Sequence, residues 1–212
     1  MSFSDLSSTI ISQAISLSPP AEKAEIRQRA SNPSYVRTPD HRALIGKAIL
    51  SFHIVGSMTL PEGWTETRQR TNAAGQRIFV EYGSSLNTDL SLSFTMADRC
   101  LDAQSRLLLL QILQLSAPVD IWIKQLAQTQ YFGGIARPNE FLLLSAHSGQ
   151  INSRRALIME GLQTTTNRNL YAAVFDTDGG RMPFTICYYA PKEDYSDWLR
   201  DVLASLTTIV WK

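Results

Sequence analysis

Three apolar, tyrosine-containing segments follow one another toward the end of the sequence: RALIMEG at residues 155–161, LYAAVF at 170–175 and FTICYY at 184–189. Aromatic and β-branched residues favour strands, and turn-forming residues separate these segments, TTNRN at 165–169 and DTDGG at 176–180. Connections this short favour antiparallel pairing, because a parallel crossover needs about a dozen residues or more. We predict strands at 154–163, 169–176 and 183–190, followed by an amphipathic helix at 191–206.

The same patterns continue upstream. Alternation of polar and apolar residues predicts strands at 49–60, 64–70, 76–82, 89–96 and 140–147. The leucine-rich residues 98–115 are too long for a strand and predict a helix, as does the segment 119–130. Together, these strands and helices predict an α+β fold with an antiparallel sheet of about six to seven strands packed between helices.

The residue pattern at positions 1–45 predicts an extension made of helix and loop. Apolar residues recur at a spacing of three to four up to Leu17, which indicates one stripe of a helix. The Pro19 and Pro20 pair then ends this helix, because proline lacks an amide donor. We therefore expect an extension at residues 1–45 and a single α+β sandwich domain at residues 46–212.

Charge and hydropathy limit the classes of partner. The 212 residues include 20 basic and 19 acidic side chains, a net charge of +1, so no chain-wide field favours a nucleic acid. The local candidates Arg68, Arg70 and Arg77 are interpreted as the polar face and turn of a hairpin. No apolar run reaches the length of about eighteen residues that a membrane span requires. We expect a cytoplasmic protein, with translocation by a leaderless route left open.

No motif indicates a cofactor or a metal. Cys100 and Cys187 are far apart in the sequence, and whether they form a disulfide stays open. The DTDGG segment at 176–180 resembles the start of a calcium loop, but Arg181 follows where further ligands are needed, so a plain turn is expected.

The histidines indicate no catalytic residues. His41 is predicted in a loop, His53 in a strand and His147 at a strand end. Ser148 beside His147 suggests a hydrolase pair, but neighbouring residues of a strand point to opposite faces. A hydrolase would require His147 to meet a buried carboxylate and a hydroxyl in space. We expect that the protein is not an enzyme.

Four segments in order resemble the PsbP-like and DcrB-like group, which includes a small Ran-binding nuclear-transport protein: LPEGW at 60–64, RALIMEG at 155–161, YYAPK at 188–192 and IVWK at 209–212. This resemblance implies an antiparallel sheet between helix layers and a protein that acts by binding other proteins. DcrB-like members are typically lipoproteins and PsbP proteins carry transit peptides. The sequence predicts neither a lipobox cysteine nor a leader, so the resemblance implies no localisation and no particular partner.

The candidate protein-binding residues are Tyr188, Tyr189, Asp176 and Asp178. Tyrosine is favoured at interfaces, and one of two adjacent strand tyrosines should face away from the core. The predicted function is a non-enzymatic protein-interaction or assembly module, for instance in a bacterial multiprotein complex, that binds another protein or itself.

The alternative function is a small-ligand or lipid-binding domain with a cavity between sheet and helices. A pocket lined by Trp64, Trp122 or Trp198 would favour this alternative.

Overall fold

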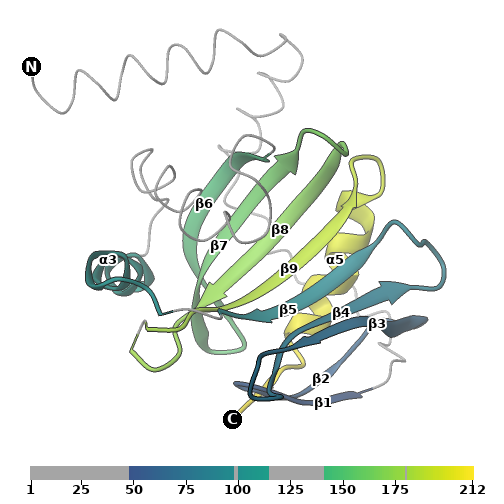
Figure 1. The fold of residues 1–212 in the computed structure, drawn as a ribbon. Coiled ribbons are helices and arrows are strands. Elements are labelled where there is room, and N and C mark those ends of the chain that lie inside the picture. The colour runs from purple at the N-terminus through teal and green to yellow at the C-terminus, as the bar shows by residue number, and fades with distance from the viewer. Residues whose placement is uncertain (1–47, 98–99, 115–140, 180) are drawn as a thin grey trace, which may run out of the picture.

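The computed structural model describes residues 48–97, 100–114, 141–179 and 181–212. Within these ranges the chain forms a seven-stranded sheet, a three-stranded sheet and two helices, an α+β fold in which every strand pair is antiparallel (Figure 1). The strands of the larger sheet are, in spatial order, β3 (Trp64–Thr71), β4 (Arg77–Ser84), β5 (Ser91–Met96), β9 (Phe184–Pro191), β8 (Arg168–Phe175), β7 (Arg154–Gln163) and β6 (Phe141–Ile151).

The smaller sheet corrects the expectation of one continuous strand at 49–60. Two strands occupy this segment, β1 (Ala48–Phe52) and β2 (Val55–Thr59), and β10 (Val210–Trp211) pairs with β2. His53 therefore lies in the turn between β1 and β2, at a positive φ of 50°, and not in a strand. The segment resembles one strand because both strands contribute buried apolar residues, Phe52 from β1 and Val55 and Met58 from β2.

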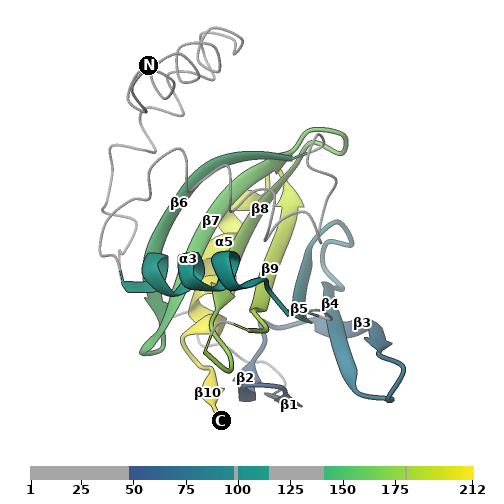
Figure 2. The same cartoon turned by 60° about the vertical axis from the view of Figure 1, so that its left-hand side comes forward.

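The two described helices lie on opposite faces of the larger sheet (Figure 2). Helix α3 (Ala103–Gln114) packs over β6 and β7 and contributes Leu109 and Ile112 to one core. Helix α5 (Tyr195–Leu206) contributes Val202 and Leu206 to the other, larger core. Each strand of the sheet centre is buried on both sides, which explains why β8 is apolar at nearly every position.

Aromatic side chains fill the larger core. Phe184 of β9 is fully buried and its ring lies 5.9 to 6.4 Å from three other phenylalanine rings, those of Phe52, Phe94 and Phe175. The three neighbours come from β1, β5 and β8, so this group joins the small sheet to the large one. Such tilted aromatic pairs add to the free energy gained by burial.

The predicted strands after residue 60 are confirmed, with ends that differ by up to four residues. The predicted helices at 98–115 and 191–206 are confirmed as α3 and α5, each shorter at its start. The extension at 1–45 and the helix expected at 119–130 lie outside the described residues. The division into an extension and one domain stays a prediction.

Candidate interaction surface

The hairpin of β3 and β4, residues 64–84, extends from the edge of the large sheet and is called the arm below (Figure 1). Its first residue, Trp64, is buried with 3% of its surface exposed. The other seven residues of β3 are all exposed, on both faces of the strand. In contrast, every second residue of β4 is buried. The arm is thus anchored at its base and along β4, while β3 is open to a partner.

A compact turn closes the arm. The Asn72 carboxamide oxygen accepts hydrogen bonds from the backbone N–H groups of Ala74 and Gln76, each at 3.0 Å. Gly75 has a φ of 77°, a conformation that glycine adopts without steric cost. The NAAG segment at 72–75 was predicted as a hairpin loop, and the structure confirms it.

Two irregularities in register bend the arm. The β3–β4 pairing shifts between Glu66 and Arg68, which leaves Thr67 as an extra residue, and again between Arg70 and Thr71. Bulges of this kind increase the local twist and change the direction in which side chains point. They account for Thr67 and Arg68 both lying beside Glu81 of the neighbouring strand.

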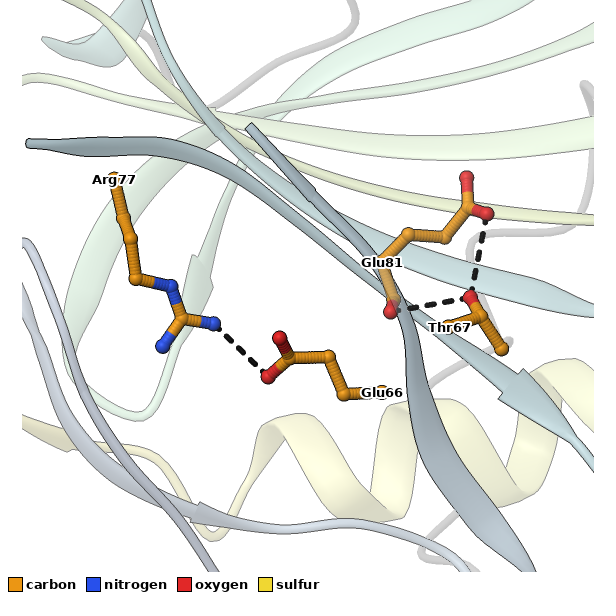
Figure 3. A network of polar contacts seen from close by, with 4 residues as sticks. All are labelled: Glu66, Thr67, Arg77 and Glu81. Carbon is orange, nitrogen blue, oxygen red and sulfur yellow. Dashed lines mark hydrogen bonds and ion pairs between the residues drawn. The ribbon is translucent and has the colours of Figure 1, made fainter. Parts of the chain in front are cut away.

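On the side of the larger core, polar contacts attach the arm to the small sheet. Arg77 Nη2 donates to Glu66 Oε2 at 2.9 Å (Figure 3). The Arg77 guanidinium also lies 5.9 Å from the centre of the Phe52 ring. The His53 ring Nε2 lies 2.6 Å from the Arg77 carbonyl oxygen. Because the ion pair is more than a third exposed, it contributes at most about 1 kcal/mol and mainly orients the arm.

On the opposite side, Thr67 Oγ1 donates to the Glu81 backbone oxygen at 3.2 Å and to Glu81 Oε1 at 3.4 Å (Figure 3). Arg68 is the register partner of Glu81, yet no ion pair joins them in the described part of the chain. The Arg70 guanidinium lies 5.8 Å from the centre of the Phe79 ring. Two exposed guanidinium groups thus lie on one face of the arm without a carboxylate partner among the described residues.

The sequence shows that three arginines lie in the hairpin, but it does not show that they have different partners. Arg68, Arg70 and Arg77 were interpreted together as a solvated hairpin face and turn, whereas the structure separates Arg77 from the other two. The exposure of β3 could have been predicted from the segment TETRQRT at 65–71, which has no apolar residue on either face of the strand. A strand with one buried face would alternate.

The predicted tyrosines point to opposite faces, and both faces are covered. Tyr188 is fully buried in the larger core, where its ring stacks on Tyr195 at 5.7 Å. Tyr189 is half-buried against the second core, with the Arg168 guanidinium 5.8 Å from its ring centre. Burial raises the pKa of both phenols above the ordinary value. Of the pair, Tyr189 alone has surface that a partner can reach.

The predicted aspartates lie in the turn between β8 and β9. Asp178 is exposed at a positive φ of 55°, a conformation that aspartate tolerates in turns. Asp176 is half-buried and its carbonyl oxygen accepts a hydrogen bond from Arg154 Nη2 at 3.0 Å. In the described ranges no group of three or more His, Cys, Asp or Glu side chains could hold a metal ion. Protein binding by Tyr188, Tyr189, Asp176 and Asp178 stays a prediction.

A second polar cluster lies under the first turn of α5. Tyr195 donates from its hydroxyl to Glu160 Oε2 at 2.9 Å, and Glu160 is half-buried on β7. Burial lowers the pKa of His147, while the nearby Glu160 carboxylate opposes that shift. Among the described residues, the Tyr195 hydroxyl donates to the Glu160 carboxylate and not to His147. Ser148 pairs with Leu157 of the second core, on the opposite face, as expected.

Removal of the hydroxyl group is expected to have opposite effects on stability at the two tyrosines that stack in the larger core. The buried Tyr188 hydroxyl has no hydrogen-bond partner among the described residues. Tyr188→Phe is expected to raise the free energy of unfolding by about 1 kcal/mol, because it removes an unsatisfied polar group. Tyr195→Phe is expected to lower it by about 1 kcal/mol, because Glu160 loses a donor. Urea unfolding of both variants measures the two shifts, and equal signs would contradict the assignment of the hydrogen bonds.

The tryptophans named as possible pocket residues and the two cysteines have the following surroundings in the structure. Trp64 is buried in the larger core and Trp198 packs against it, whereas Trp122 lies outside the described residues. Cys100 is exposed and Cys187 buried, and both are free thiols, so no disulfide joins them. No helix in the described ranges is long and apolar enough to cross a membrane.

The arrangement of strands and helices described above is similar, as a fold, to that of a solved PsbP structure. A structure of cyanobacterial PsbP from Synechocystis is similar to this chain with a TM-score of 0.52 at 12% identity, over 83% of this chain and 99% of that protein. The resemblance expected from the sequence is thereby confirmed at the level of the fold.

Two further structures are more distant. The Ran-binding protein Mog1p from Saccharomyces cerevisiae has a TM-score of 0.42 at 11% identity, over 78% of this chain and 88% of its own. LpqN of Mycobacterium tuberculosis, described as involved in cell envelope biogenesis, has a TM-score of 0.39 at 10% identity, over 82% of this chain and 90% of its own. No protein-family model matches the sequence, and a comparison with curated proteins found no match.

Proposed function

We propose that this chain is a non-enzymatic protein-interaction module and that the arm is its main contact surface. The observation that carries the proposal is the exposure of β3 at seven of its eight positions, on a hairpin whose other strand is packed into the core. An edge strand presents unpaired backbone groups to solvent, which makes it a natural place for another chain to bind.

The side chains of the arm support this proposal. Arginine is enriched at protein interfaces, both for its bidentate hydrogen bonds and for its stacking on aromatic rings. Arg70 already stacks on Phe79 in the free chain, so less conformational entropy is lost when a partner binds. The contacts of Arg77 with Glu66 and with the small sheet hold the arm in one orientation. This too reduces the conformational entropy that is lost when a partner binds.

Residues 1–45 are proposed as a second contributor to assembly, because their sequence predicts an amphipathic helix. A helix with one apolar stripe gains stability by packing that stripe against another surface. We propose an assembly of several proteins as the setting, of which a bacterial multiprotein complex is one kind.

Affinity capture with matched baits tests the proposal. The baits are the intact chain, a chain lacking residues 1–45, the double variant Arg68→Glu with Arg70→Glu, and Arg200→Glu as a control with its charge reversed on the exposed side of α5. We expect one partner to be recovered in stoichiometric amount by the intact chain and the Arg200 control, and several-fold less by the arm variant. Circular dichroism establishes that the baits are folded.

The outcomes separate the two contributors. Loss of the partner on removal of residues 1–45 alone would assign the interface to the extension and not to the arm. Equal recovery by all four baits would contradict both assignments. Recovery of no stoichiometric partner by any folded bait would contradict the proposed function itself.

A further inference from the structure

Two arginines of the arm, neither of which has a carboxylate partner among the described residues, form a spaced pair. Arg68 and Arg70 are two residues apart on β3 and pair with Glu81 and Phe79 in unbroken register, so both point to the same face. Because a strand rises about 3.4 Å per residue, their side chains start about 7 Å apart. That spacing equals the distance between alternate residues of any extended segment that lies alongside.

The carboxylates of the arm are engaged elsewhere. Glu66 on the inner face is bound by Arg77, and the Glu81 side chain accepts a hydrogen bond from Thr67. Glu81 is the cross-strand neighbour of Arg68, so a free Glu81 side chain would be within reach of the Arg68 guanidinium. Glu81 keeps its negative charge, and the Thr67 hydroxyl helps to orient this carboxylate in a position where no ion pair with Arg68 forms among the described residues.

The backbone edge of β3 is open in the described part of the chain. It is the terminal strand in the order β3-β4-β5-β9-β8-β7-β6, and the residues that follow Trp64 are exposed. An extended peptide that adds to such an edge forms main-chain hydrogen bonds, and the side chains at alternate positions determine which peptide binds.

We propose that the β3 edge binds an extended segment of a partner protein that carries acidic residues at alternate positions, so that two carboxylates contact Arg68 and Arg70. This inference rests on the proposed function and specifies the chemistry of the partner. Each carboxylate forms a charge-assisted hydrogen bond with a guanidinium, which is the stronger class of hydrogen bond. The two guanidinium groups repel a basic segment, so they provide specificity in addition to the affinity for carboxylates.

A synthetic peptide tests the inference directly. The probe is a fluorescein-labelled peptide of about ten residues, a length that covers one strand, with alternating glutamate and valine. Two peptides serve as controls, one of the same composition with its glutamates contiguous, and one with lysine in place of glutamate. Fluorescence anisotropy with the intact chain measures the Kd, and NMR amide exchange of β3 reports whether the peptide joins the sheet.

We expect the alternating acidic peptide to bind and to slow amide exchange in β3. The double variant Arg68→Glu with Arg70→Glu is expected to weaken binding about tenfold or more, which corresponds to about 1.4 kcal/mol, while Arg200→Glu leaves the Kd unchanged. Thr67→Val is expected to weaken binding several-fold without any change in formal charge, because it frees Glu81 to neutralise Arg68. Its control, Thr65→Val, changes an exposed threonine of the same strand.

Several results would overturn the inference. Equal binding of the contiguous and alternating peptides would indicate a general charge effect, and unchanged exchange in β3 would place the peptide elsewhere. Tighter binding of an oligonucleotide than of the peptide would assign the arginines to phosphate. No binding of the peptide, combined with a partner whose capture depends on Arg68 and Arg70, would contradict strand addition and leave the proposed function intact.

Discussion

Replacement of Phe184 by alanine is expected to lower the free energy of unfolding by about 3 to 5 kcal/mol, the largest loss of any single change considered. The side chain is fully buried on β9 and contacts the rings of Phe52, Phe94 and Phe175. Alanine leaves a cavity at the junction of the two sheets, which packed neighbours fill only in part. For a chain of this size the loss lowers the Tm by roughly 6 to 20 °C.

Urea unfolding followed by tryptophan fluorescence measures this loss. Phe79→Ala is the matched control, because Phe79 is half-buried on the arm and should cost about 1 kcal/mol, an amount that burial of its partly exposed ring supports. A loss below about 1 kcal/mol for Phe184→Ala would contradict the central position of this ring.

Replacement of Trp211 by alanine is expected to lower the free energy of unfolding by about 2 to 3 kcal/mol. This value is below the range for a fully buried tryptophan because the side chain is half-buried. Its ring lies 4.9 Å from the Phe175 ring and 5.4 Å from the Arg154 guanidinium, and Nε1 donates to the Asn152 carbonyl oxygen at 3.0 Å. These contacts attach β10 to the β7 and β8 end of the large sheet.

Two variants separate the parts of this effect. Trp211→Phe keeps an aromatic ring but loses the N–H donor, so it is expected to cost about 1 kcal/mol. Val210→Ala, at the neighbouring residue that is 57% exposed, is expected to change stability by less than about 0.5 kcal/mol. Calorimetry of the three variants checks the order, and an equal effect of all three would indicate fraying of β10 instead of loss of the tryptophan contacts.

The regular strands of this fold are predictable from local pattern. The segment RALIMEG lies within β7 and FTICYY within β9, as predicted, because strand-favouring apolar residues are bounded there by turn-forming ones. The β1–β2 turn at His53 was missed, because its residues lack the glycine and proline that identify most turns. The chain turns at His53 because β1 and β2 pair with each other, with Ala48 opposite Thr59. This pairing is a tertiary contact, and no local residue pattern indicates it.

The candidate surface was predictable in part. The hairpin and its loop were expected, and TETRQRT is visibly polar throughout. That Glu66 binds Arg77 and Thr67 binds Glu81 was not predictable, since these pairs are eleven and fourteen residues apart and depend on two shifts in register. The prediction for Tyr188 and Tyr189 assumed one solvated face, whereas both faces of β9 are covered.

The amino-acid sequence by itself determined the class of fold, the strands from β3 to β9 and the polar character of the arm, because side-chain periodicity and turn chemistry act over a few residues. Only the tertiary structure decided that β5 pairs with β9 and that β10 returns to β2. It also decided that, among the described residues, Arg77 has a carboxylate partner in Glu66 whereas Arg68 and Arg70 have none. Such contacts join residues distant in the chain, and burial of both sheet faces selects among many possible pairings.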